Sequence, residues 1–384
     1  MANITYLLGA GASANCLPVV SNMNQRLLSM HKVFYSLNDN RKVYDSFSEM
    51  SLVKKKYGTT IKNILDDIKW IIEETNKHQT IDTVAKKFYL NSSQHNNLKR
   101  LKYILILLFL YEQKMPKELL LNELFDSDSE NPKITKELYD KRYDTFLASI
   151  INNKIDHIEL NKSVKILTWN YDVQLEIALK NYLPINFDDI QKHSQSIPSR
   201  YTLLDENYNK NKFDHNKFGI VRLNGIALHD DLDSIIEIET NNKSFLDTDF
   251  ISTEHFLIEL IRTYSDFQTK SVTKFFNFSW EINNQFEEKD KLYYEKFNIV
   301  DEIAKITDVL VIIGYSFPLF NREIDKRIFN NMYKVKSVYI QDLDSEKIEE
   351  LFLSIHQDGH RLKGLIRKTK NVDQFIIPYE LDFI

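Results

Sequence analysis

Cysteine and glycine are both scarce in this chain of 384 residues, and each scarcity excludes something. The single cysteine, Cys16, cannot form an internal disulfide or supply the four thiolates of a zinc ribbon. The chain has 8 glycines, whereas average usage of about 7% would give roughly 27. A sequence this sparing with glycine should place one only where the backbone requires it.

Neither a dominant charge nor a long apolar run is present. Charged residues make up 27% and hydrophobic residues 43% of the chain, which is typical of a globular protein. The net charge of -5 argues against a dedicated nucleic-acid-binding protein. The most apolar run, Tyr103 to Tyr111, is about half of the ~20 residues that a membrane-spanning helix needs. No basic segment precedes the apolar run that ends at Cys16, so we expect no signal peptide and a cytoplasmic protein.

Short apolar runs alternate with helical patterns towards both ends of the chain, which predicts an α/β fold. The predicted strands are Ile4–Leu8, Val164–Thr168, Ile220–Leu223, Val309–Ile313, Val338–Gln341 and a closing strand near Phe375–Ile377. We expect a Rossmann-like doubly wound parallel sheet with large helical insertions. Its core would comprise residues 1–40, 160–230 and 305–384, and the insertions would be residues 41–159 and 231–304.

Four of the eight glycines follow predicted strands: Gly9, Gly11, Gly225 and Gly314. Ligands of open parallel sheets bind beyond the carboxyl ends of the strands, so these glycines mark one shared edge. The segment from Gly9 to Ala14 (GAGASA) fits the dinucleotide fingerprint G-x-G-x-x-(G/A) between a strand and a helix. Small residues there let the backbone approach a pyrophosphate, and the helix amino end attracts its charge. A tight turn without any ligand explains the same residues.

Four elements in the same order resemble the sirtuin family. GAGASANCLP from Gly9 to Pro18, WNYD from Trp169 to Asp172, Gly225, and GYS from Gly314 to Ser316 match the family's GAG, (Q/W)-N-x-D, HG and G-(T/Y)-S elements. The resemblance implies that Asn170 and Asp172 lie near the nicotinamide ribose of NAD. The residues that it assigns to binding of the nucleotide are Gly9, Ala10, Gly11, Ala12, Ser13, Pro18, Gly225, Gly314, Tyr315, Ser316, Gln341 and Asp342.

The departures from the family concern its zinc ribbon, its substrate loop and its catalytic histidine. The cysteine count excludes the zinc ribbon, so no zinc or other metal is expected. Cys16 stands where a glycine is usual, and Val19 to Ser21 replace the family's D-F-R, so a peptide-substrate cleft is not expected.

Asn224 stands where the family has its catalytic histidine before Gly225. Three readings of this departure stay open. Asn224 binds a ribose hydroxyl without acting as a base, His229 takes over as the base, or the chain carries an engineered substitution. His229, beside Asp230 and Asp231, also fits an ordinary surface histidine.

The resemblance is to the zinc-free, sirtuin-like branch of bacterial antiphage systems, whose members hydrolyse NAD. It implies an NAD+ glycohydrolase that forms nicotinamide and ADP-ribose as an abortive-infection effector. The alternative is a catalytically weak scaffold that binds NAD or ADP-ribose. A generic Rossmann oxidoreductase is disfavoured, because no acidic residue ends a second strand about 20 residues beyond the glycines.

The expected partners also follow from the resemblance. A HerA-type ATPase is the first expectation and a short Argonaute the second, with no membrane and no specific nucleic-acid binding. We expect a homo-oligomer whose contacts run mainly through the helical insertions, because helices need partners for their apolar stripes. The runs Leu105 to Tyr111 and Phe275 to Trp280 are apolar enough to pack both a core and a subunit interface.

Overall fold

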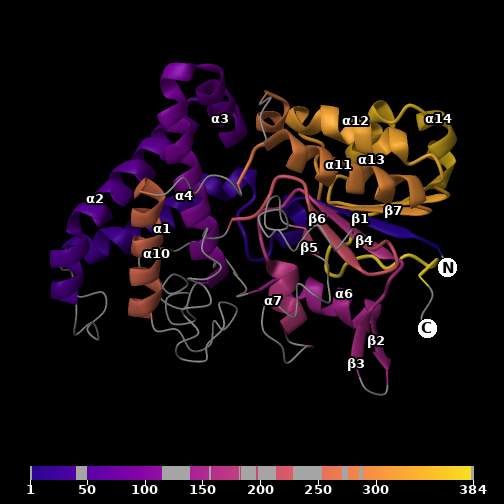
Figure 1. Ribbon diagram of the computed structural model, residues 1–384, viewed down its shortest axis with the longest axis horizontal. Coiled ribbons are helices and arrows are strands. Elements are labelled where there is room, and N and C mark those ends of the chain that lie inside the picture. The colour runs from indigo at the N-terminus through magenta and orange to yellow at the C-terminus, as the bar shows by residue number, and fades with distance from the viewer. Residues whose placement is uncertain are drawn as a thin grey trace. The chain divides into compact units, whose positions relative to one another are not determined.

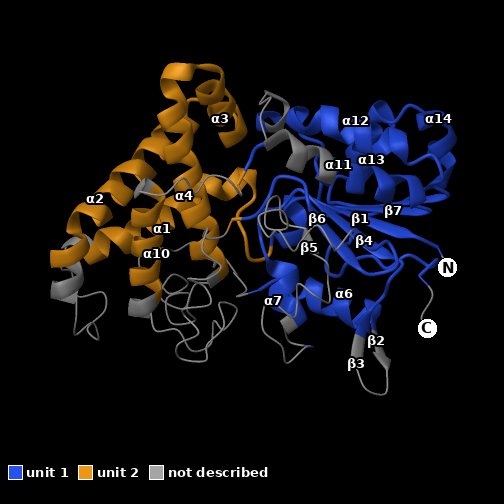
Figure 2. Cartoon of the chain, viewed as in Figure 1, with its two compact units in different colours: residues 1–14, 139–226, 277–384 blue, residues 15–138, 227–276 orange. Residues whose placement is uncertain are grey.

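The computed structural model describes residues 2–39, 50–114, 139–154, 157–180, 182, 196–197, 213–227, 253–269, 276–284 and 289–381. The chain divides into two compact units (Figure 2). We call the first, residues 1–14, 139–226 and 277–384, the sheet unit. We call the second, residues 15–138 and 227–276, the helical unit.

The sheet unit is organised around a parallel sheet. Its seven described strands are β1 (Ile4–Leu8), β4 (Val164–Thr168), β5 (Ser196–Ile197), β6 (Gly219–Arg222), β7 (Val309–Ile313), β8 (Ser337–Gln341) and β9 (Ile366–Thr369). They lie in the order β5-β6-β4-β1-β7-β8-β9, and each neighbouring pair is parallel. Without β5 this is the Rossmann order 3-2-1-4-5-6, in which the direction of winding reverses between β1 and β7.

Helices cover both faces of this sheet, so the predicted fold class is confirmed. On one face lie α11 (Lys289–Ile306), α12 (Arg322–Asn331) and α13 (Ser345–Ile355); on the other lie α6 (Arg142–Ile150) and α7 (Gln174–Lys180) (Figure 1). The buried cluster on the first face includes Leu7, Leu167, Val221, Ile312, Ile340, Phe297, Ile328 and Phe352. On the second face, Tyr6 of β1 meets Phe146 of α6 edge-on, with ring centroids 4.9 Å apart.

Burial on both faces explains the sequence pattern of the central strands. All five residues of β1, of β4 and of β7 are buried. A strand that is covered on both faces reads as a nearly continuous apolar run rather than an alternating one. The bounds of these three strands are those predicted from the sequence.

The helical unit consists, in its described part, of α1 (Met23–Asp39), α2 (Met50–Thr75), α3 (Ile81–Leu90), α4 (His95–Lys114) and α10 (Thr253–Thr269). Aromatic contacts join α10 to α4: the ring centroids of Tyr103 and Phe267 lie 5.3 Å apart. The Tyr264 hydroxyl of α10 donates to Asp67 of α2 over 2.5 Å. Among the residues described, no helix combines the length and apolar character needed to cross a membrane.

The predicted closing strand near Phe375–Ile377 is wrong. The last strand is β9, and residues 375–377 have no strand structure. The apolar run at Phe375 reflects side-chain packing rather than a strand, because the ring of Phe375 packs edge-on against Tyr143, with centroids 4.9 Å apart. β9 escaped prediction because its sequence, IRKT, is polar and only partly buried, as is usual for a strand at the edge of a sheet.

The boundaries of the units differ from those predicted. Residues 15–40, expected in the core, belong to the helical unit. Residues 139–159 and 277–304, expected in the insertions, belong to the sheet unit. The physical reason is that α6 and α11 turn their apolar stripes to the sheet. Residues 151–154 and 157–160 are also not helical, because β2 (Ile151–Lys154) and β3 (His157–Leu160) pair as antiparallel strands.

The described hydrophobic residues of the two apolar runs are buried within the chain. Every residue from Leu105 to Tyr111 is at most 9% exposed. Phe276, Phe278 and Trp280 are buried as well, and Phe275 lies outside the described residues. The described residues of these runs therefore supply core packing, as predicted, and subunit contacts through the insertions stay a prediction. The oligomeric state stays a prediction.

Candidate functional site

The ends of the central strands lie in one aligned row. Leu8 of β1 pairs with Thr168 of β4 on one side and with Ile313 of β7 on the other. Thr168 pairs in turn with Arg222 of β6, and Ile313 with Gln341 of β8. The loops that follow these five strands therefore start from the same edge of the sheet. This is the edge at which open parallel sheets bind ligands, and the reversal point between β1 and β7 lies at its centre.

Three glycines at the reversal point bring two loops into direct backbone contact. The Gly11 amide donates to the Gly314 carbonyl over 2.9 Å. A Cβ atom on Gly11 would lie 2.7 Å from Gly314 Cα, and one on Gly9 would lie 2.5 Å from the Gly314 carbonyl oxygen. Gly314 also has φ +57°, which side chains disfavour. The close approach of the two loops therefore requires all three glycines, whether or not a ligand binds.

The segment after β1 differs from the predicted phosphate cradle. The four residues Ala10–Ser13 form a short 3₁₀ helix, and the next long helix, α1, begins at Met23 in the helical unit. The first long helix amino end after the glycines therefore belongs to the helical unit, and its attraction for a pyrophosphate stays a prediction.

The amides of the glycine loop (Gly9–Ser13) are also largely engaged. Those of Gly9, Gly11 and Ala12 donate to the backbone carbonyls of Ile313, Gly314 and Gly9, respectively. In this conformation they are not open to a phosphate. The prediction that the loop cradles a pyrophosphate gains no support from the geometry.

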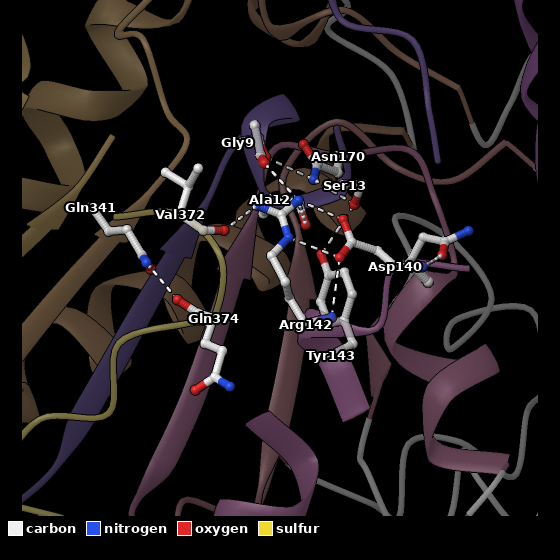
Figure 3. Close-up of polar contacts among 12 residues, drawn as sticks. Gly9, Ala12, Ser13, Asp140, Arg142, Tyr143, Asn170, Gln341, Val372 and Gln374 are labelled. Atoms are coloured by element: carbon white, nitrogen blue, oxygen red, sulfur yellow. Dashed lines mark hydrogen bonds and ion pairs between the residues drawn. The ribbon is translucent and has the colours of Figure 1, made fainter. Parts of the chain in front are cut away.

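Side-chain donors hold the carbonyls of the glycine loop (Figure 3). Arg142 Nη2 donates to the carbonyls of Gly11, over 3.1 Å, and Ala12, over 3.2 Å. The Arg142 guanidinium is itself paired with the buried carboxylate of Asp140, with Nε to Oδ1 at 2.8 Å and Nη2 to Oδ2 at 2.5 Å. Sequence reasoning missed both residues, because it placed this segment in a helical insertion and no local pattern links it to the glycines.

Ser13 connects the glycine loop to the WNYD element. Its hydroxyl lies 3.1 Å from the Tyr143 hydroxyl and accepts a hydrogen bond from Asn170 Nδ2 over 3.5 Å. Burial raises the pKa of Asp172 to about 6, although hydrogen bonds from the Gln174 amide and from Ser13 favour the ionised form. The Asp172 carboxylate therefore titrates close to neutral pH.

A fully buried ion pair contacts the backbone of Asp172. Arg222 and Glu176 have side chains that are each 2% exposed, and Arg222 Nη2 lies 2.5 Å from Glu176 Oε1. The same nitrogen donates to the carbonyl of Asp172 over 3.3 Å. The pair thus fixes the backbone of Asp172 from the end of the neighbouring strand β6. Asp172 Oδ1 in turn accepts the amide of Gln174, at the start of α7.

Asn170 and Asn224 each follow the end of one of two neighbouring strands, β4 and β6. Each lies two residues beyond the register pair Thr168–Arg222. Asn170 Nδ2 donates to the Gly9 carbonyl over 2.9 Å. No described residue donates a hydrogen bond to Oδ1 of Asn170.

Asn224 carries the most informative atom of the site. Its side chain is 8% exposed, and its Oδ1 is buried without a hydrogen-bond donor among the described residues. Leaving a buried acceptor unpaired costs about 1–3 kcal/mol. Gly225, with φ +97°, turns the chain directly after it. A ligand hydroxyl or a water that donates to Oδ1 would relieve this cost.

Tyr315 and Ser316, predicted to contact the nucleotide, differ in exposure. The Tyr315 ring is buried against Trp169, with centroids 6.0 Å apart, and its hydroxyl donates to Asp325 over 2.8 Å. Burial raises the pKa of Asp325 to about 8. Tyr315 is therefore a core residue, whereas Ser316 is exposed. Phe317, which follows, has φ +51°, an uncommon conformation for an aromatic residue.

Gln341 and Asp342 end β8, and the structure gives each an internal partner. Gln341 Nε2 donates to the carbonyls of Asn371, over 2.7 Å, and Gln374, over 2.6 Å. Its Oε1 accepts the Ile376 amide over 3.0 Å, so this side chain holds the carboxyl-terminal segment. Asp342 is half-buried and accepts the Asp344 amide over 2.9 Å.

Two predicted site residues do not belong to the described part of the sheet unit. Pro18 is buried within the helical unit, and His229 lies outside the described residues. In the part of the chain that the structure describes, no three His, Cys, Asp or Glu side chains could hold a metal ion together.

Comparison with known proteins adds no relative. No family model matches the chain, and a search of curated proteins finds no match. The likeness to sirtuins therefore rests on the four short elements and on their common place at one edge of the sheet.

Proposed function

We propose that the protein binds NAD+ at this edge of the sheet and hydrolyses the bond between nicotinamide and ribose. The observation that supports it best is the buried Oδ1 of Asn224, which has no hydrogen-bond donor among the described residues and which, like Asn170, lies two residues beyond the end of its strand. Two amide oxygens in this arrangement suit a ligand with vicinal hydroxyls, such as ribose. The sequence resemblance adds NAD as the nucleotide.

Cleavage of this bond needs little assistance from a general base, because the leaving group is neutral. The bond between the ribose C1′ and the nicotinamide nitrogen breaks, and nicotinamide leaves as a neutral molecule with the bonding electrons. Positive charge then develops on the ribose, and a water oxygen bonds to C1′ and releases a proton. In this proposal Asn170 and Asn224 hold ribose hydroxyls, and the Asp172 carboxylate stabilises the developing positive charge.

A second candidate function is binding without turnover. Asn224 is neutral and cannot take up a proton at ordinary pH, unlike the histidine of the family motif. The engaged amides of Gly9, Gly11 and Ala12 also argue for a site that holds the nucleotide less firmly than a phosphate cradle. A subunit that senses NAD or ADP-ribose within a larger complex would have these properties.

The two candidates separate in one experiment. Purified protein is incubated with NAD+, and nicotinamide and ADP-ribose are quantified by chromatography, with ADP-ribose binding measured by calorimetry. Hydrolysis that falls by about tenfold or more in Asn224→Ala and is kept in Asn216→Ala, a change at an exposed asparagine of the sheet unit, supports the enzyme. Binding of ADP-ribose without nicotinamide release supports the scaffold. Neither binding nor release refutes both.

The biological role and the partners are proposed on the resemblance alone. We propose an antiphage effector whose hydrolysis of NAD is controlled by a HerA-type ATPase, with a short Argonaute as the second candidate. Release of nicotinamide is measured with and without each partner, and light scattering gives the oligomeric state. Equal activity with and without either partner at nanomolar concentration would contradict this control.

A further inference from the structure

Lys296 is a buried amine beside the candidate site. It belongs to α11 of the sheet unit and is 7% exposed. Its Nζ donates to the carbonyl of Leu223 over 2.8 Å, and it lies 5.2 Å from the ring centroid of Phe297. No described carboxylate forms an ion pair with it. Sequence reasoning missed it, because one lysine in a charged helix carries no signal.

This lysine is unfavourable for the fold. A buried ammonium group without a carboxylate partner loses its hydration and gains little in return. Burial accordingly lowers the pKa of Lys296 to about 7. An apolar side chain of similar length would fill the same space without that loss. A residue that weakens the fold and yet contacts a candidate site is a candidate for a functional role.

The Lys296 hydrogen bond holds the peptide unit on the amino-terminal side of Asn224. The carbonyl before Asn224, that of Leu223, accepts from Lys296 Nζ, and the carbonyl of Asn224 itself accepts from the Asn277 amide over 2.9 Å. The Leu223 amide donates to Thr168 over 2.8 Å. Each peptide unit is planar, so holding both carbonyls determines the two dihedral angles of Asn224. Those angles set the direction in which its side chain leaves the backbone.

We propose that Lys296 is a positioning residue for Asn224, aiming the unpartnered Oδ1 at the place where a ligand hydroxyl donates. The effect on turnover rests on the proposed function, whereas the effect on the backbone does not. If Lys296 only stabilised the fold, its replacement would lower the stability of the protein. A positioning role predicts that the stability is unchanged or higher.

The test uses Lys296→Met in the full chain, because methionine keeps the length of the side chain and removes the donor. The matched control is Lys305→Met, an exposed lysine on the same helix. We expect the melting midpoint of Lys296→Met to be unchanged or higher. Amide hydrogen exchange at Leu223 and Asn277 should be faster by about tenfold or more. Because small displacements of reacting groups lower rates strongly, kcat for nicotinamide release should fall by about tenfold or more with little change in KM.

A double variant connects the effect to Asn224. If Lys296 acts through Asn224, adding Lys296→Met to Asn224→Ala should lower kcat no further. Additive losses, unchanged exchange at Leu223 and Asn277, or a lower melting midpoint with faster exchange throughout β1 and β7 would each overturn the proposal. If the wild-type protein releases no nicotinamide, the proposed function fails. Faster exchange confined to Leu223 and Asn277 would then still support the positioning role.

Discussion

Replacing Gly314 with alanine tests the backbone contact at the reversal point of the sheet. The added Cβ atom would lie 2.5 Å from the carbonyl carbon of Gly11, which is backbone and cannot rotate away. The left-handed conformation of Gly314 costs a residue with a side chain about 1–2 kcal/mol, and overpacking typically costs about 1–3 kcal/mol. Together the two effects should lower the free energy of unfolding by about 2–5 kcal/mol.

The measurement is urea denaturation followed by tryptophan fluorescence, to which Trp169 contributes because its ring stacks on Tyr315. Gly364→Ala in the same unit is the matched control, because a Cβ atom there meets no atom within 4 Å. A loss below about 0.5 kcal/mol for Gly314→Ala, within the range of ordinary surface substitutions, would refute the close-packing argument.

The same geometry changes how a Gly11 variant is interpreted. If a pyrophosphate lay against Gly11, a side chain at this position would block it. The structure places such a side chain 2.7 Å from Gly314 Cα instead. Loss of NAD binding in Gly11→Val would therefore report damage to the fold as readily as loss of a binding contact, and only the polar variants around Asn224 address the ligand.

Three further variants test the polar network. Asp172→Asn should stabilise the protein at pH 7, because the pKa of Asp172 is raised from 3.8 to about 6. The stability of the wild-type protein relative to this variant should fall by up to about 3 kcal/mol as the pH rises from 4 to 6, and a pH-independent difference in urea titrations would contradict this. Arg142→Met should cost about 3–5 kcal/mol by leaving Asp140 buried without its partner, and Asp140→Asn in the same chain should recover part of the loss. If the double variant is no more stable than Arg142→Met alone, the pair is not coupled. Asn224→Ala should leave the free energy of unfolding unchanged or raise it by up to about 1–3 kcal/mol, because it removes a buried oxygen without a donor among the described residues, while nicotinamide release falls by about tenfold or more. A large loss of stability would make Asn224 a structural residue.

The bounds of the central strands β1, β4 and β7 could be predicted because burial on both faces leaves a local signal. Ile4–Leu8 and Val309–Ile313 are apolar runs that each end at a glycine, and the structure gives β1 and β7 these bounds. The register then places the predicted loops on one edge. The scarcity of glycine also pointed to this edge, since Gly9, Gly11 and Gly314 are needed where two loops touch.

The side-chain hydrogen bonds that hold the candidate site together left no local signal in the sequence. Arg142 meets Gly11 across 131 positions of the chain, and Asn170 meets Gly9 across 161. Lys296 reaches Leu223 from a helix that the sequence analysis had assigned to an insertion. β9 and the packing of Phe375 were likewise decided by neighbours distant in sequence. Periodicity reports whether a residue is buried, whereas the partner of a buried polar group depends on which segments the folded chain brings together, and only the tertiary structure determines that.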